Sequence, residues 1–193
     1  IRRRYDVKVY EEFVIKGNTA VLRCHIPEYV REFVTVTAWQ VDEANLTVEN
    51  DLFPTGELHI RKVDAADAMS RYQCQTQHRL TGETVSSPSS RKLTVRESFA
   101  MSPRIVDSRR QVRADKGLSA ELPCAAQGEP VPVYQWFRKV RGQAVPLLPG
   151  PRLLQLDGTL VAVTDAGLYT CFVNNTSGSD TVDTELQVSG KRV

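Results

Sequence analysis

One order of cysteine, tryptophan and tyrosine residues occurs twice along this chain and restricts its fold more than any other feature. The two copies consist of Cys24, Trp39, Tyr72 and Cys74 in the first half and Cys124, Trp136, Tyr169 and Cys171 in the second. In each copy the tyrosine lies two residues before the second cysteine. Each half of the chain therefore holds one widely separated cysteine pair with a large aromatic ring between its members.

This order is typical of the immunoglobulin-type β-sandwich, in which each residue has a structural task. Cysteines on strands B and F of opposing sheets bridge the core, the strand C tryptophan packs against the sulfurs, and the tyrosine hydroxyl holds the corner between strands E and F. We therefore predict an all-β fold of two tandem immunoglobulin-like domains, residues 1–97 and 98–193. The expected disulfides are Cys24–Cys74 and Cys124–Cys171.

Alternating apolar and polar residues place several strands of this fold. Ala20 and Leu22 are expected to point inward on strand B, and Leu58 and Ile60 inward on strand E. In the second half, the prolines of residues 128–132 directly precede the expected strand C, where they would interrupt a sheet edge. This second domain resembles the intermediate set of immunoglobulin domains found in adhesion proteins.

The composition limits which binding partners and which cellular compartment can be expected. The 193 residues are 41% hydrophobic, enough for two small cores, and 25 basic against 23 acidic side chains leave a formal charge of only +2. Nucleic acid, which demands a strongly basic face, is not an expected partner. Disulfides that close loops of about 50 residues contribute about 4 kcal/mol each and persist only in oxidising compartments, which indicates an extracellular protein.

The sequence contains no apolar run of membrane-spanning length, and its first residues lack the apolar core of a signal peptide. We therefore expect a fragment whose signal and membrane anchor lie elsewhere. The expected location is the extracellular part of a plasma-membrane protein, with a secreted form as a further expectation.

Residue types that often carry chemistry show no catalytic or metal-binding arrangement. His25, His59 and His78 lie on predicted strands or hairpin edges, without a nucleophile in a recognisable turn and without zinc-ligand spacing. Asp67 and Asp165 precede the two tyrosine corners, where an acid usually ties down the turn. We predict no enzymatic activity, no cofactor, no metal ion and no small-molecule substrate.

Surface modification and glycan binding are also suggested by short motifs. Basic clusters at residues 2–4, 109–110 and 138–141 can hold sulfated glycans, although the acidic residues scattered through the chain favour a solvated surface. The acceptor pattern for N-linked glycans occurs at Asn45, Asn174 and Asn175. The last two acceptors overlap in the predicted hairpin between strands F and G.

The outer face of the first domain is the remaining candidate site. Its expected residues are Val21, Arg23 and His25 on strand B and Glu57, His59 and Arg61 on the neighbouring strand E. Mixed charges around an apolar centre could match a second copy of themselves. An ordinary solvated sheet face has the same composition, so the residue types alone leave both interpretations open.

Three stretches of the first half resemble one known family more closely than the cysteine framework requires. They are residues 14–24 (VIKGNTAVLRC), 56–61 (GELHIR) and 78–84 (HRLTGET). They are similar to the variable seventh immunoglobulin domain of arthropod Dscam, the Down syndrome cell adhesion molecule. Residues 128–133 (GEPVPV) and 173–176 (VNNT) resemble the eighth domain, so the resemblance covers essentially the whole chain.

This resemblance implies a receptor of neurons or immune cells whose alternatively spliced isoforms bind an identical copy on an apposed cell, as in neuronal self-avoidance. It implies an antiparallel homodimer through the face of strands A, B, E and D of the first domain, onto which the six outer-face residues map. On a two-fold interface, opposite charges such as Glu57 and Arg61 can pair across the symmetry axis. The charge pattern would then decide which isoforms match.

Two other functions remain open. The pair of domains could be the ligand-binding ectodomain of a signalling receptor, which binds a different protein or a glycan through loops or basic clusters. It could also be a passive spacer that holds other domains of a long ectodomain apart. Self-association of the chain would distinguish a homophilic adhesion receptor from both of these functions.

Overall fold

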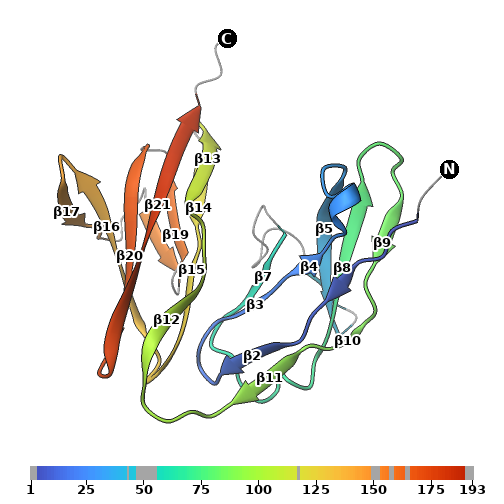
Figure 1. The fold of residues 1–193 in the computed structure, drawn as a ribbon, viewed down its shortest axis with the longest axis horizontal. Helices are drawn as coiled ribbons and strands as arrows, with labels where there is room; N and C mark the ends of the chain where they lie inside the picture. Colours follow the sequence, from blue (N-terminus) through green and yellow to red (C-terminus); the bar gives the residue numbers. More distant parts are fainter. Residues whose placement is uncertain are drawn as a thin grey trace. The chain divides into compact units, whose positions relative to one another are not determined.

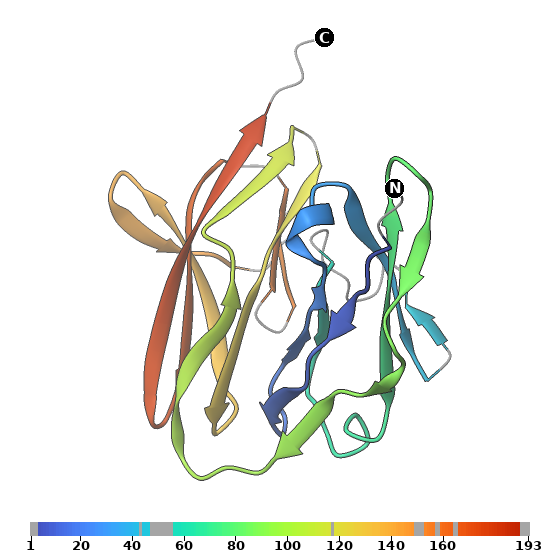
Figure 2. The same ribbon diagram turned by 45° about the vertical axis from the view of Figure 1, so that its right-hand side comes forward.

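The computed structural model describes residues 4–42, 44–46, 56–116, 118–148, 153–156, 159–163 and 166–189. The chain forms two compact units, Ile1–Glu97 and Ser98–Val193, called domain 1 and domain 2 below (Figures 1 and 2). All regular elements in the described ranges are strands except the 3-10 turn η1, Glu28–Val30. The predicted all-β fold of two immunoglobulin-like domains is therefore confirmed.

Domain 1 is a two-layer sandwich. Its strands are β1 (Lys8–Val9), β2 (Glu12–Ile15), β3 (Ala20–Leu22), β4 (Cys24–His25), β5 (Val34–Val41), β6 (Ala44–Leu46), β7 (Leu58–Ile60), β8 (Arg71–His78), β9 (Thr84–Ser86), β10 (Ser90–Arg91) and β11 (Leu93–Arg96). One layer has the order β10-β8-β5-β6, with β9 also paired to β8. The other contains the antiparallel pairs β1–β4 and β3–β7, and β2 runs parallel to β11.

Domain 2 repeats this plan with longer strands. They are β12 (Met101–Ser108), β13 (Gln111–Asp115), β14 (Ser119–Leu122), β15 (Cys124–Glu129), β16 (Val133–Val140), β17 (Gln143–Pro146), β18 (Leu153–Leu156), β19 (Thr159–Val163), β20 (Gly167–Asn175) and β21 (Gly178–Ser189). One sheet has the order β13-β21-β20-β16-β17 and the other β14-β19-β18, with β12 paired to β15. The strand β12 begins at Met101, so the segment without regular structure before it ends at Ala100.

A disulfide and a tryptophan occupy the centre of each domain, as predicted. Cys24–Cys74 and Cys124–Cys171 join the two layers with Cα–Cα distances of 6.0 and 6.6 Å. Both tryptophans, Trp39 and Trp136, are 0% exposed, and each lies opposite the strand F cysteine of its own domain. Burying about 200 Å² of aromatic surface stabilises a fold by about 5 kcal/mol at 25 cal/mol/Å².

Strand F shows why these sequences form strands around that centre. In β8, Tyr72, Cys74 and Thr76 are buried while the residues between them are more exposed, and β20 repeats the alternation. The Tyr72 hydroxyl donates a hydrogen bond to the Asp67 carbonyl at 3.0 Å, which is the predicted tyrosine corner. The Asp67 carboxylate accepts a bond from the Asp64 N–H at 2.8 Å. Asp67 therefore has the structural role expected of it, and Asp165 lies outside the described residues.

Candidate protein interface

The candidate face is formed by strands B and E of domain 1, which are neighbours as predicted. The strands β3 and β7 pair antiparallel, with Val21 directly opposite His59. Their flanking residues Ala20, Leu22 and Leu58 belong to the buried hydrophobic cluster of domain 1. Since successive residues of a strand point to opposite faces, Val21 and His59 point away from that cluster.

The six predicted interface residues are not equally accessible. Arg23 and His25 are exposed, and Glu57 and Arg61 are half-buried. Val21 and His59, however, are only 3% and 2% exposed. The assignment of all six residues to a partner interface stays a prediction. Alternation identifies the face of a strand that points away from the core, but it carries no information about what lies over that face.

The structure adds three residues in and beside the first strand that sequence reasoning missed. Asp6, Lys8 and Tyr10 are exposed, whereas the residues between them, Val7 and Val9, are buried. Strand β1 pairs with β4 so that Lys8 lies opposite His25 on the same face. The alternating run in residues 5–10 is visible in the sequence and could have indicated this strand.

An aromatic pair is the most distinctive feature of the exposed part of this face. Tyr10 is 62% exposed, and its ring packs edge-on against the His25 imidazole with 5.4 Å between centroids. Tyrosine and arginine are among the residue types most enriched at the energetic centres of protein interfaces. We call Asp6, Lys8 and Tyr10, together with the six predicted residues Val21, Arg23, His25, Glu57, His59 and Arg61, the outer face of domain 1.

Charge on the outer face extends to the neighbouring strand β2. Burial raises the pKa of the Glu12 carboxyl, and the positive charge of Arg23 partly opposes that rise. Arg23 is thus close enough to interact electrostatically with Glu12 while its own side chain is exposed. An acidic and a basic group therefore lie close together at this edge of the outer face.

The remaining candidate residues have structural explanations. His78 stacks on Phe33, with 5.9 Å between ring centroids and 19° between ring planes, and its Nδ1 accepts the Leu80 N–H at 3.3 Å.

In the described part of the chain, no three His, Cys, Asp or Glu residues lie together in a way that could hold a metal ion. No described helix is long and apolar enough to cross a membrane.

The basic cluster at residues 138–141 is largely committed to contacts within domain 2. Arg138 Nη2 donates to the Ala166 carbonyl at 3.0 Å, and Lys139 Nζ lies 2.7 Å from an Asp183 carboxylate oxygen. Two of its charges are thus held by the domain's own acceptors. Of the cluster at residues 2–4, Arg2 and Arg3 lie outside the described residues.

The three glycan acceptors differ in their surroundings. Asn174 is exposed at the end of β20, as expected for the F–G hairpin. Asn175 is half-buried and takes part in three hydrogen bonds, described further below. Asn45 lies in β6, and its side chain is outside the described residues.

The sandwich topology and the two intersheet disulfides define an immunoglobulin-domain protein. The sequence model described as "Immunoglobulin domain" matches residues 102–175. Among curated proteins, the chain is 37% identical to "Cell adhesion molecule Dscam1" of Drosophila melanogaster over 98% of the chain and 10% of that protein. It is 38% identical to "Cell adhesion molecule DSCAML1" of Mus musculus over 92% of the chain and 9% of that protein.

A solved structure agrees with these relatives. The crystal structure of the N-terminal four immunoglobulin domains of Dscam1 isoform 4.44 matches with a TM-score of 0.85 and 34% identity, over 98% of the chain and 54% of that structure. The two domains are therefore homologous to immunoglobulin domains of the Dscam and DSCAML1 cell adhesion molecules. The chain spans about a tenth of the length of these curated relatives.

Proposed function

We propose that the chain is part of the ectodomain of a cell-surface adhesion receptor and that domain 1 binds an identical copy of itself on an apposed cell. The observation that carries this proposal is the homology of nearly the whole chain to cell adhesion molecules. The two disulfides support an extracellular location, because such bonds persist in oxidising compartments. A secreted form is part of the same proposal.

The contact surface in this proposal is the outer face of domain 1, in an antiparallel two-fold pairing. The six residues predicted from the sequence all belong to this surface, and Val21 and His59 are its least exposed members. The face combines an exposed tyrosine with basic and acidic groups, so a two-fold axis can place each charge against its opposite twice. A specific dimer of this kind buries about 800 Å² on each partner.

Isoform specificity follows from the same surface. Changing a few charges on one face places like charges against each other in mismatched pairs, which costs several kcal/mol, while matched pairs are unaffected. The solved relative is one numbered isoform of its protein, which supports the existence of variants. Vertebrate and insect relatives match the chain similarly well. Four further statements are therefore proposals: alternative splicing, a role in neurons or immune cells, an arthropod source, and identity as domains seven and eight.

The first test is self-association of the chain. Analytical ultracentrifugation should show a concentration-dependent dimer, and cells that display the chain should aggregate. Arg23→Glu and Glu57→Arg should each weaken association by about tenfold or more, since each places like charges across the axis. A suitable control is Arg91→Glu, which reverses an exposed charge on the opposite sheet and should have no effect.

Mixing the two variants tests whether Arg23 meets Glu57 across the axis. A chain with two acidic residues at these positions faces a chain with two basic residues, so both contacts become attractive again. Cells with Arg23→Glu should therefore aggregate with cells carrying Glu57→Arg, although neither type aggregates alone.

A strictly monomeric chain at high concentration would refute self-recognition. Retention on heparin without self-association would favour a glycan-binding ectodomain, and neutral charge reversals would favour a spacer.

A further inference from the structure

The F–G turn of domain 2 contains two overlapping glycan acceptor sequences whose asparagines differ in structure. The first is Asn174-Asn175-Thr176 and the second is Asn175-Thr176-Ser177. Strand β20 ends at Asn175, and β21 begins at Gly178 after a tight turn. A glycan replaces one hydrogen of the side-chain amide nitrogen and needs open space beyond it. The hydrogen bonds of each amide nitrogen and the space around it therefore indicate which of the two asparagines can carry a glycan.

The amide of Asn175 is fully engaged. Its Nδ2 donates hydrogen bonds to the Met101 carbonyl at 2.8 Å and to the Pro130 carbonyl at 2.9 Å, which uses both hydrogens. Its Oδ1 accepts a bond from the Ser177 N–H at 2.8 Å. Asn175 thus ties the first strand of the domain and the loop after β15 to the F–G turn. A sugar on Nδ2 would break at least one of these bonds.

Space around the Asn175 amide is also lacking. A Cβ atom added at Gly128 would lie 3.2 Å from Asn175 Nδ2 and 3.0 Å from the Pro132 ring, so even a methyl group is crowded there. Ser102 Oγ donates to the Ser177 carbonyl at 2.6 Å, which holds the turn against β12. The hydrogen bonds and the packing both prevent a glycan at Asn175 in the folded domain.

The side chain of Asn174 has the opposite orientation. Val173 is 0% exposed and belongs to the core cluster of domain 2, so Asn174 points away from the core. Its neighbours across the sheet are Val133 on β16 and Ser179 on β21, and both are exposed. Val133 is 66% exposed, and residues directly opposite on paired strands lie about 5 Å apart on the same face. The first sugar of a glycan on Asn174 would therefore cover an exposed apolar side chain.

We infer that Asn174 carries an N-linked glycan and that Asn175 is a structural residue that stays unmodified in the folded protein. The inference rests on the extracellular part of the proposed function and is independent of self-recognition by domain 1. A chain modified at Asn175 would lose the bonds between β12, the loop after β15 and the F–G turn. Such a chain would be depleted from the folded, secreted population.

The test is to secrete the chain from eukaryotic cells and locate the glycan. Peptide N-glycosidase converts a glycosylated asparagine to aspartate, so fragment-ion mass spectrometry distinguishes adjacent positions. We expect aspartate at position 174 and asparagine at position 175. A glycan at Asn175, at both residues or at neither would overturn the inference, and none of these results bears on dimer formation.

Two matched variants separate the overlapping acceptor sequences. Thr176→Ala removes the first acceptor and leaves the second, whereas Ser177→Ala removes the second and leaves the first. Neither side chain takes part in the hydrogen bonds of Asn175, because Ser177 contributes only its backbone. We expect Ser177→Ala to keep the glycan and Thr176→Ala to lose it. The reverse result would overturn the inference.

The structural role of Asn175 has its own readout. In enzymatically deglycosylated protein, Asn175→Ala should lower the melting temperature of domain 2 by roughly 5 °C or more, because three hydrogen bonds are lost. Asn174→Gln should leave that temperature nearly unchanged. Equal melting temperatures for the two variants would contradict the structural role assigned to Asn175.

Discussion

The two domains share a topology but build their last strand differently. In domain 2, strand G is the continuous β21, Gly178–Ser189. In domain 1 it is divided into β9, β10 and β11, with Pro88 in the first gap. Proline has no N–H group to donate to the neighbouring strand, so an uninterrupted ladder cannot run through this position.

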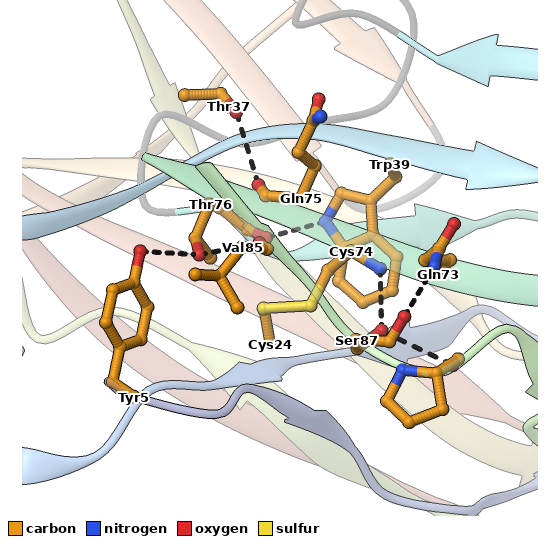
Figure 3. Close-up of a disulfide and its surroundings, with 12 residues drawn as sticks. Tyr5, Cys24, Thr37, Trp39, Gln73, Cys74, Gln75, Thr76, Val85 and Ser87 are labelled. Atoms are coloured by element: carbon orange, nitrogen blue, oxygen red, sulfur yellow. Dashed lines mark hydrogen bonds between the residues drawn. A yellow bond between two sulfur atoms is a disulfide. The ribbon is translucent and has the colours of Figure 1, made fainter. Parts of the chain in front are cut away.

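A serine side chain compensates for the interruption beside the disulfide of domain 1. The Ser87 N–H donates to the Cys74 carbonyl at 2.9 Å, and the Cys74 N–H donates to Ser87 Oγ at 3.0 Å (Figure 3). Ser87 is 1% exposed, so these bonds are shielded from water. In domain 2 the corresponding cysteine, Cys171, lies opposite Val182 in an unbroken ladder. The same core can therefore be completed by backbone pairing or by a buried hydroxyl.

The largest expected effect is one that the two domains share. Replacing both cysteines of a domain by alanine should destabilise domain 1 and domain 2 by about 4 kcal/mol each, because the disulfides close loops of similar length, with sequence separations of 50 and 47. Scanning calorimetry of the two variants checks this. A difference of more than about 2 kcal/mol between the domains would show that chain entropy is not the main contribution.

The second effect belongs to domain 1 alone. Ser87→Ala leaves the buried Cys74 N–H without its acceptor and should destabilise domain 1 by about 1–3 kcal/mol. Hydrogen exchange at the Cys74 amide should accelerate, while exchange at Cys171 stays unchanged. Ser86→Ala, at the exposed neighbouring position, is the control and should change stability by less than about 0.5 kcal/mol. Equal effects of the two variants would refute the compensating role of Ser87.

Buried threonines should respond with opposite signs in the two domains. Thr76 is 0% exposed, and its hydroxyl donates to the Val85 carbonyl at 2.9 Å and lies 3.3 Å from the Tyr5 hydroxyl (Figure 3). Thr184 is also 0% exposed, but its hydroxyl has no hydrogen-bond partner among the described residues. Thr76→Val should destabilise domain 1 by about 1–2 kcal/mol, and Thr184→Val should stabilise domain 2 by about 1 kcal/mol. Denaturant unfolding measures both, and effects of equal sign would contradict the prediction.

The smallest effect concerns acid stability. Hydrogen bonds from Lys139 and Thr170 lower the pKa of the Asp183 carboxyl, so its folded-state pKa lies below its unfolded value. The resulting stability is present above the unfolded pKa and is lost as the pH falls through the folded pKa. Asp183→Asn should remove it, with a loss below about 1 kcal/mol at neutral pH because the pair is exposed.

Domain 1 should be less sensitive to acid. Asp42 also has a lowered pKa, through hydrogen bonds from Ser70 and the Arg71 N–H, but burial raises the pKa of Glu12. A raised carboxyl pKa makes the folded state bind protons more readily, so this contribution increases as the pH falls. Unfolding of both domains between pH 7 and 3 tests the difference. A larger acid loss in domain 1 would refute it.

Most of the fold could be predicted from the sequence because it depends on residue types at set positions. The order of Cys24, Trp39 and Tyr72 identified the sandwich, the disulfide and the tyrosine corner. Alternation located strands B and E, and their pairing followed from the topology of the immunoglobulin sandwich. The broken strand G of domain 1 was not predicted, since the bonds that Ser87 makes depend on where Cys74 lies on another strand.

The candidate site could be predicted only in part. Arg23 and His25 are exposed as expected, but Asp6, Lys8 and Tyr10 were overlooked, although their alternation with buried valines is visible in the sequence. The alternation around Val21 and His59 predicts only the direction of these side chains, because a residue's neighbours in the chain carry no information about its exposure, which is 3% and 2% here.

The amino-acid sequence by itself determined two disulfide-bonded immunoglobulin-type sandwiches, since cysteine spacing, aromatic residues and strand alternation are local properties of the chain. Only the tertiary structure decided which polar side chains are available. Asn174 and Asn175 are adjacent and chemically identical, yet the amide of Asn175 is bonded to Met101 and Pro130, which are 74 and 45 residues away. Contacts of that range arise when the strands assemble, so no local pattern distinguishes the two asparagines.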